Sequence, residues 1–284
     1  MIRRFPFLAL LAATVCQSVQ AQQPEHPETT ETRISETVLA CVQGTLGAEP
    51  DRVATCLHPR VNQVQVRRTS ADAGDFLGFR TFSGLLEVAR SLSDRADGLE
   101  KRVQVEILEF GHGMAGVKAV SRYRHEFFHL AEFDGSWKAV NILTAGIAPE
   151  STADSVSWRE SEEAPVRQAA LDYIEGSFAG DPDRMAKGIH PEINKVFPAI
   201  GRDGTVFLHL MGASDLVEGT RAGLGNVEEN DRSIEVEVQD IFGDAAAVTV
   251  RSSAYIDHLH VAKIDGEWRI VNVLWIPRPG REST

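Results

Sequence analysis

An internal repeat constrains the fold of this chain more than any other feature of its sequence. Residues 42–59 (V-Q-G-T-L-G-A-E-P-D-R-V-A-T-C-L-H-P) match residues 174–191 (I-E-G-S-F-A-G-D-P-D-R-M-A-K-G-I-H-P) at a constant offset of 132 positions. Residues 129–143 (H-L-A-E-F-D-G-S-W-K-A-V-N-I-L) match residues 260–274 (H-V-A-K-I-D-G-E-W-R-I-V-N-V-L) at an offset of 131. The chain therefore consists of two copies of one unit of about 115 residues, a normal size for a single domain.

The repeat defines the expected domain organisation of the 284 residues. We predict a first domain over residues 34–147 and a second domain over residues 164–278. Residues 148–163 are rich in Ser and Glu and lack a hydrophobic period, which is typical of a linker. Residues 22–33 are polar and acidic and are predicted to be disordered, and residues 279–284 are predicted to form a tail.

The first residues have the features of a secretory signal peptide. Residues 1–21 contain two arginines, an apolar stretch and a small-residue cleavage site before Gln22. No later apolar run approaches the roughly 20 residues of a membrane span. We therefore expect a periplasmic or secreted protein. A lipoprotein signal acylated on Cys16 is the alternative, but Val15 is bulkier than the residue that usually precedes such a cysteine.

Composition and charge exclude several classes of protein. The chain is 43% hydrophobic and 25% charged, which excludes a disordered, fibrous or polytopic membrane protein. Its 29 basic and 41 acidic side chains give a net charge of −12. Because phosphate neutralisation needs clustered Lys and Arg, we expect no nucleic-acid partner.

Each copy is predicted to consist of helices followed by strands, most clearly in the second copy. Apolar residues recur at helical spacing over residues 164–178, and Asp181 and Pro182 provide the N-cap and first residue of a second, short helix. A third helical segment is predicted over residues 205–222. Strands are predicted over residues 234–241, 245–252, 254–264 and 267–275, the last two joined by an Asp265-Gly266 hairpin turn. The unit is therefore α+β, with about three helices on a curved antiparallel sheet.

The repeat also relates two cysteines to each other. Cys41 and Cys56 would remain in an oxidising compartment, where a pair forms a disulfide more often than a metal site. They align with Tyr173 and Gly188 of the second copy. The second copy combines a large ring with a glycine, and the first copy combines two small thiols. Such a compensating change in size indicates that the two positions are in contact. We predict a Cys41–Cys56 disulfide, with two buried free cysteines as the alternative.

The same motifs carry a resemblance to a known family. The second copy has Y-I-E-G-x-x-x-G-D-x-x-R-M in its helical pair and Y-I-D-x-L-H-V-x-K-I-D-G-E-W-R-I-V-N-V-L-W in its last hairpin. It resembles the putative lumazine-binding family of the nuclear transport factor 2-like (SnoaL-like) superfamily, and the first copy resembles it more weakly. The resemblance implies two cone-shaped α+β domains, each with a pocket between helices and sheet. Because this superfamily includes enzymes, binding proteins and interaction modules, the resemblance does not decide the activity.

The resemblance also suggests which side chains line the pocket. Compared with the ketosteroid isomerase pattern of the superfamily, Tyr173 falls at the phenol of the oxyanion hole and His260 near the acid that accompanies it. Phe197 stands at the position of the general base, and the first copy has Gln65 there, so neither copy can take a proton from carbon. The first copy also has Cys41 in place of the phenol. Isomerase chemistry is therefore not expected, whereas Tyr173, His260 and Phe197 are candidates for lining a ligand pocket.

The histidines before the last hairpin raise the question of a metal site. His258 and His260 are two residues apart on a predicted strand and share a face. A third ligand is not evident, because Val271 and Val273 are expected opposite them. We predict no metal and no cofactor, and we retain His129, the counterpart of His260, as a pocket candidate.

Two pairs of matching polar residues complete the set of candidates. Asn141 and Asn272 lie on the last predicted strand of each copy and are pocket candidates, although hydrogen bonds to neighbouring backbone are the simpler role. Glu126 and Asp257 are acidic at matching positions, and exposed charges at a sheet edge are the default expectation for both.

Three functional hypotheses follow. The first is a secreted, non-catalytic tandem protein that binds a small organic ligand. The second is a lyase, isomerase or cyclase that acts on a carbonyl-bearing small molecule in the second domain. The third is an interaction module. Because sheets of this superfamily often pair face to face, the two copies are expected to form an intrachain pseudo-dimer, and a further homo-oligomer is left open.

Overall fold

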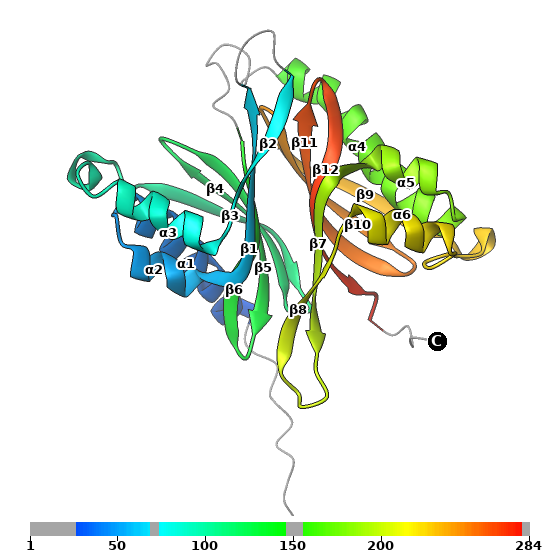
Figure 1. Ribbon diagram of the computed structural model, residues 1–284, viewed down its shortest axis with the longest axis horizontal. Helices are drawn as coiled ribbons and strands as arrows, with labels where there is room; N and C mark the ends of the chain where they lie inside the picture. The colour runs from blue at the N-terminus through cyan, green and yellow to red at the C-terminus, as the bar shows by residue number, and fades with distance from the viewer. Residues whose placement is uncertain (1–26, 69–73, 146–155, 280–284) are drawn as a thin grey trace, which may run out of the picture.

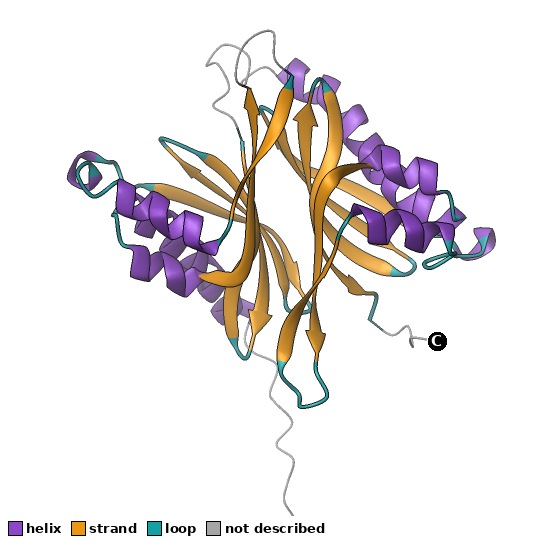
Figure 2. Cartoon of the chain, in the orientation of Figure 1, coloured by secondary structure: helices purple, strands orange, loops and turns teal. Residues whose placement is uncertain are grey.

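The computed structural model describes residues 27–68, 74–145 and 156–279 and contains two α+β units, each a six-stranded sheet covered by helices on one side (Figure 1). Figure 2 shows the four layers in the order helices, sheet, sheet, helices. The first unit contains α1 (Pro27–Leu46), α2 (Pro50–Cys56), β1 (Leu57–Arg68), β2 (Asp75–Arg80), α3 (Phe82–Ser91), η1 (Ala96–Gly98), β3 (Val103–Gly111), β4 (Met114–Ser121), β5 (His125–Phe133) and β6 (Ser136–Thr144). The second contains α4 (Val156–Ala179), α5 (Pro182–Gly188), β7 (Ile189–Ile200), β8 (Val206–Met211), α6 (Ala213–Arg221), η2 (Glu229–Asp231), β9 (Ile234–Phe242), β10 (Ala245–Ser252), β11 (Tyr255–Ile264) and β12 (Glu267–Pro277).

Both sheets have the same topology. Their strand orders are β2-β1-β6-β5-β4-β3 and β8-β7-β12-β11-β10-β9. β1 runs parallel to β6 and β7 runs parallel to β12, whereas the other neighbouring pairs are antiparallel. The predicted hairpin turn is present, with φ of 50° at Asp265 and 84° at Gly266, as a tight two-residue turn requires. The sequence repeat is therefore a repeat of the fold, and the predicted α+β class is confirmed.

The two sheets pack face to face, and the helices cover their outer sides (Figure 1). Apolar residues that fill the space between the sheets come from both units and include Phe127 and Leu143 of the first and Val271 and Leu274 of the second, all fully buried. A separate core lies between helices and sheet in each unit. The expected intrachain pseudo-dimer is therefore present.

Two strands were not expected from the sequence. β7 contains Pro191 and Pro198, and proline is unusual inside a strand because it has no N–H to donate. β8 occupies the start of the helical segment predicted over residues 205–222, and only α6 within it is helical. The predicted third helix was therefore too long.

Two flanking segments are also more ordered than the sequence suggested. α1 begins at Pro27, so part of the segment predicted to be disordered is helical, and Arg33 Nη2 contacts Glu132 Oε1 at 2.6 Å. α4 begins at Val156, so part of the predicted linker is helical, and Trp158 packs against the core of the second unit. The remainder of both segments, the predicted signal peptide and most of the predicted tail lie outside the described residues.

The first unit contains the predicted Cys41–Cys56 disulfide, which joins α1 to the end of α2 across a separation of 15 residues. Replacing both cysteines by alanine should lower the free energy of unfolding by about 3 kcal/mol, because a cross-link of this loop length restricts the unfolded chain. Urea unfolding of the two proteins measures the difference. Two reactive thiols in the unfolded, non-reduced protein starting at Gln22 would contradict the bridge itself.

Gly188 allows α4 and α5 to approach each other. A Cβ at this position would lie 2.6 Å from Ala169 O and 2.7 Å from Tyr173 N, both backbone atoms that cannot move independently. We expect Gly188→Ala to cost about 1–3 kcal/mol by overpacking. Gly98→Ala is the control, because a Cβ there meets nothing within 4 Å, and its unfolding free energy should change by less than about 0.5 kcal/mol. Equal effects in urea unfolding would show that the helix contact is not tight.

Candidate functional site

The second unit contains a pocket of about 120 Å³ between its helices and its sheet. Its polar end is formed by Tyr173 on α4 and Lys195 on β7, and its rim by residues of α6 and the loop that follows. The lining residues are Tyr173, Ile174, Ser177, Met185, Lys195, Met211, Asp215, Leu216, Gly219, Thr220, Leu224, Gly225, Tyr255 and Trp275. The pocket therefore has an apolar body with one cationic group.

Three buried polar groups form a hydrogen-bonded chain at the polar end. The Tyr173 hydroxyl donates to Asp257 Oδ1 at 2.9 Å and accepts from Lys195 Nζ at 2.5 Å. Lys195 Nζ also lies 3.6 Å from Asp257 Oδ1, which makes an ion pair. The second oxygen of Asp257 is buried and has no hydrogen-bond partner among the described residues. The chain thus links one base, one acid and one phenol away from bulk water.

Burial determines the electrostatics of these three groups. It raises the pKa of Tyr173 well above the ordinary value of 10.0, and the adjacent Asp257 raises it further. Burial also raises the pKa of Asp257 and lowers the pKa of Lys195, and the attraction between the two opposes both shifts. Whichever of Lys195 and Asp257 holds the shared proton, the pair carries no net charge.

Aromatic rings surround the Lys195 amine. Its Nζ lies 4.4 Å from the centre of the Trp275 ring, 5.1 Å from that of Tyr173 and 5.7 Å from that of Tyr255. The rings of Tyr255 and Trp275 are perpendicular to each other, with centres 5.2 Å apart. Rings at these distances attract a cation and fix the orientation of the side chain.

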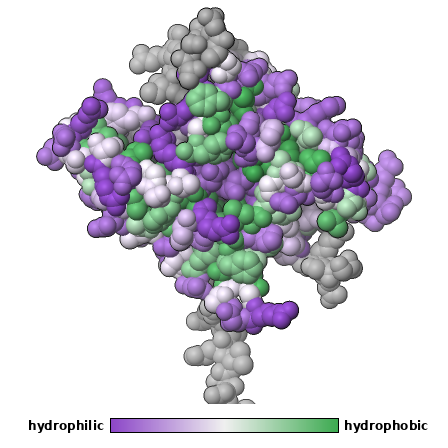
Figure 3. All heavy atoms as spheres, in the orientation of Figure 1, coloured by the Kyte–Doolittle hydropathy of each residue, from purple (hydrophilic) through white to green (hydrophobic). Residues whose placement is uncertain are grey.

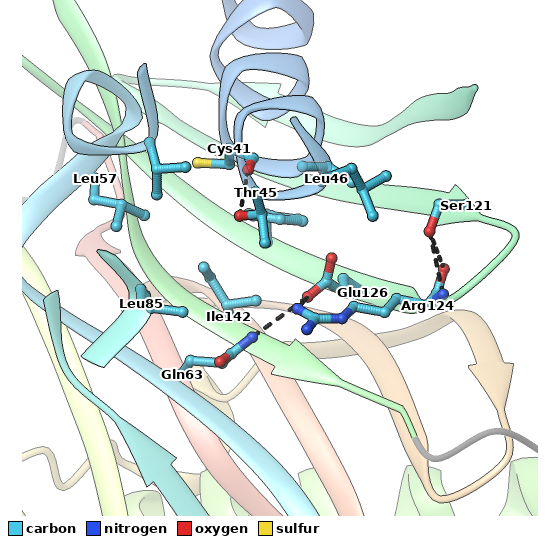
Figure 4. Close-up of a pocket in the computed structure, with 13 residues that line it drawn as sticks. Cys41, Thr45, Leu46, Leu57, Gln63, Leu85, Ser121, Arg124, Glu126 and Ile142 are labelled. Carbon is cyan, nitrogen blue, oxygen red and sulfur yellow. Dashed lines mark hydrogen bonds and ion pairs between the residues drawn. The ribbon is translucent and has the colours of Figure 1, made fainter. Parts of the chain in front are cut away.

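The equivalent position in the first unit is almost closed. Its cavity is about 30 Å³, and Figure 4 shows Gln63, Glu126 and Arg124 converging at its polar end. Gln63 Nε2 donates to Glu126 Oε1 at 3.3 Å and to Thr144 Oγ1 at 2.9 Å. Gln63 and Glu126 are the counterparts of Lys195 and Asp257. The first copy therefore keeps a polar cluster but lacks the amine and most of the open space.

The structure separates the predicted pocket residues into two groups. Tyr173 lines the pocket of the second unit. Phe197 on β7 lies next to this pocket without lining it, and its ring packs against those of Trp275 and His209 with centres 4.8 and 4.9 Å away. His260, His129, Asn272 and Asn141 do not face either helix–sheet pocket. They are buried between the two sheets. His260 and Tyr173 therefore do not share a cavity.

The alternation of side chains along β11 explains this difference, and a β-bulge in β12 determines which residue lies opposite His260. Regular pairing from the Asp265-Gly266 turn would place Val271 opposite His260, but the register shifts by one residue and Asn272 pairs with His260 instead. Because successive side chains alternate between faces, Asp257 points toward the helices and His258 and His260 point toward the other sheet. The first unit has the same shift after His129.

Asp257 and Glu126 are not exposed edge charges, since they are 0% and 5% exposed. The sequence analysis does not single out Lys195, because a lone lysine in a segment without a predicted helix or strand is usually a solvated residue. Two observations could have found this cluster: the acid is present in both copies, and the repeat places Lys195 opposite a polar Gln63.

The centre of the sheet–sheet interface is polar and nearly symmetric. The rings of His129 and His260 stack with centres 3.5 Å apart, and His258 meets His129 edge-on at 6.2 Å. Asn62 Nδ2 donates to Asn272 Oδ1 at 3.1 Å, and its counterpart Asn194 donates to Asn141 Oδ1 at 2.7 Å. These contacts fix how the two sheets are aligned with each other. In the described parts of the chain, no group of three or more His, Cys, Asp or Glu side chains could hold a metal ion.

The surface also has hydrophobic regions outside the pocket. Figure 3 shows them over β2 and over the β7–β8 hairpin, where Phe76, Ile200 and Phe207 are exposed. A hollow of about 760 Å³ lies between the units and is lined by Ile200 and Val206, among others. It is open and lacks the buried polar groups that characterise the smaller pocket.

Residues 161–276, which lie in the second unit, match the model of a family described as "Putative lumazine-binding". The first unit has the same strand order as the second, so the chain is a tandem of two domains with one topology. No helix in the part of the chain that the structure describes is long and apolar enough to cross a membrane.

Several solved structures are similar to about two fifths of the chain. A nuclear transport factor 2-like protein of unknown function from Shewanella baltica OS155 is 18% identical, with a TM-score of 0.35 over 43% of this chain and 97% of its own. One from Silicibacter pomeroyi DSS-3 is 17% identical, with a TM-score of 0.35 over 42% and 98%. A ketosteroid isomerase-like protein from Erwinia carotovora atroseptica SCRI1043 is 15% identical, with a TM-score of 0.28 over 42% and 96%. No curated protein matches the chain.

Proposed function

We propose that this protein is an exported, non-catalytic binding protein that takes a small organic molecule into the pocket of its second domain. The observation that carries the proposal is the difference between the two copies. The same position is a closed polar cluster around Gln63 in the first domain and an open pocket around Lys195 in the second. A pocket with an apolar body and few polar groups is the usual form of a ligand site.

Two further observations support the finer parts of the proposal. The phenol hydrogen of Tyr173 is already donated to Asp257, and Phe197 stands where a general base would be needed. Export is supported by the signal-like residues 1–21 and by the Cys41–Cys56 disulfide, a bond typical of oxidising compartments. The first domain then serves as the fixed half of the pseudo-dimer.

Blocking the pocket mouth tests the proposal. Leu224 lines the pocket and is 70% exposed, so Leu224→Trp should fill the entrance without disturbing the core. Phe207→Trp is the control, because Phe207 is exposed on β8 and does not line the pocket. We expect ligand-observed NMR with a fragment library to detect binders of the parent protein and of the Phe207 variant that the Leu224 variant loses. Binding that survives Leu224→Trp, or no binder at all, would contradict the proposal.

A carbonyl-directed enzyme in the second domain is the second candidate. The raised pKa of Asp257 and the lowered pKa of Lys195 favour it, because a proton passed from Lys195 to Asp257 would leave an amine that can take a proton from carbon and a Tyr173 hydroxyl that can stabilise the enolate oxygen. Such an enzyme would exchange the hydrogens next to a ketone carbonyl for deuterium in D₂O, and Tyr173→Phe would slow the exchange. If the parent protein exchanges no faster than buffer, the enzyme hypothesis is rejected and the binding proposal stands.

A further inference from the structure

The size of the pocket limits its occupant. Its volume is about 120 Å³. An apolar cavity of about 150 Å³ accepts one benzene molecule, whereas drug-sized ligands occupy about 300–1,000 Å³. One five- or six-membered ring therefore fits, and a two-ring heterocycle such as a lumazine fits only if the pocket widens.

The free hydrogen-bond donors at the polar end of the pocket determine which kind of ligand atom can bind there. Lys195 is a donor with up to three N–H groups. In the described part of the chain its Nζ makes one hydrogen bond, to Tyr173, and one ion pair, with Asp257. The Tyr173 hydrogen is donated to Asp257. Lys195 thus has donor capacity left, as does the indole N–H of Trp275, which is buried without a hydrogen-bond partner among the described residues, and a ligand atom that meets either group must be an acceptor.

Charge balance selects a neutral acceptor. Lys195 and Asp257 together carry no net charge, and Asp215, the acid that lines the pocket, is exposed at the rim, where it accepts from Gly212 N at 2.8 Å. A carboxylate ligand would add a buried negative charge without a counter-ion, and an ammonium would lie next to the lysine. Both are costly in a desolvated site. A carbonyl oxygen accepts a hydrogen bond without adding charge.

We propose that the ligand is a neutral single-ring compound with a carbonyl group, such as a cyclic ketone or lactam, whose oxygen accepts a hydrogen bond from Lys195 while its ring lies against Trp275 and Tyr255. The inference rests on the proposed function of the same pocket and adds the chemical class of its ligand. In this proposal Lys195 selects the ligand by its carbonyl oxygen, and the rings of Trp275 and Tyr255 orient the ligand.

A series of small probes of similar size tests the inference on the unmodified protein. The probes are cyclohexanone, methylenecyclohexane, cyclopentanecarboxylate and cyclohexylamine, with lumazine as the two-ring compound, and dissociation constants are measured by NMR titration. We expect cyclohexanone to bind about tenfold or more tightly than methylenecyclohexane, since a hydrogen bond to a charged donor separates them. The carboxylate, the amine and lumazine should bind more weakly than the ketone.

Two variants link the selectivity to the lysine. Lys195→Met should remove the preference for the ketone over the alkene, and Lys187→Met, the same change at an exposed position of α5, should retain it. Equal binding of ketone and alkene to the parent protein, a preference for the carboxylate, or tighter binding of lumazine would overturn the inference and leave the binding function intact. If no probe binds and no fragment binds in the Leu224 experiment, both proposals fail together.

Discussion

Lys195→Met should destabilise the protein by about 3–5 kcal/mol, because removing one partner of a buried ion pair leaves the other without compensation. Asp257 is 0% exposed and would keep only its bond from Tyr173. The loss should be largest at neutral pH. It should shrink as the pH falls, because a protonated Asp257 no longer carries a buried charge. Urea unfolding of the variant at pH 7 and at pH 5 measures both effects.

The control and the repair variant make this prediction specific. Lys187→Met changes an exposed lysine of the same domain and should alter the unfolding free energy by less than about 0.5 kcal/mol. Lys195→Met combined with Asp257→Leu should recover part of the loss, since no charge is then buried. If the single Lys195 variant unfolds at the same urea concentration as the parent at pH 7, the buried pair does not exist in solution.

Acidification from pH 7 to pH 5 should weaken the contact between the two sheets. Burial lowers the pKa of His129 and His260 well below 6.5, and burial, opposed by Glu109 and aided by Arg251, lowers the pKa of His258 to about 4. Below pH 6.5 each of these histidines is protonated in the unfolded chain and neutral in the fold. Stability is therefore retained above pH 6.5 and falls by about 1.4 kcal/mol per pH unit for each histidine until its folded pKa is reached.

The first copy suggests the variant that tests this effect. Phe127 occupies the position of His258 in the first domain, so His258→Phe introduces a residue that this fold already accommodates there. We expect its stability to fall less steeply between pH 6.5 and pH 5 than that of the parent. His112→Asn changes an exposed histidine with a φ of 52°, which asparagine tolerates, and should leave the slope unchanged. A parent protein whose urea midpoint is constant from pH 7 to pH 5 would show that the histidines are not buried at an interface.

The sequence predicts the fold well where local signals agree with each other. The Asp265-Gly266 turn and the alternating strands before and after it are recovered almost to the residue. The prediction fails at β7, because Pro191 and Pro198 hide a strand whose pairing is parallel and distant in sequence. Long-range pairing of this kind leaves little trace in local composition.

The site was only partly predictable for a different reason. Side chains of β11 alternate between the two faces of the sheet, so His260 lies at the interface and Asp257 faces the helices, and a one-residue bulge in β12 places Asn272 opposite His260. Lys195 joins Asp257 only because β7 lies next to β12 in space. The Cys41–Cys56 contact was predictable because the aligned residues of the second copy, Tyr173 and Gly188, indicate contact between the same two positions.

The central claim is that the pocket of the second domain, and not its counterpart or the interface, holds the ligand. Amide NMR spectra of the isotope-labelled protein, recorded while cyclohexanone is added, test it most directly. We predict saturable shifts at Gly219, Thr220 and Gly225, which line the pocket, and none at Leu46 and Leu85, which line the closed cavity of the first domain. Shifts confined to the first domain or to the sheet–sheet interface, or no saturable shifts anywhere, would contradict the account.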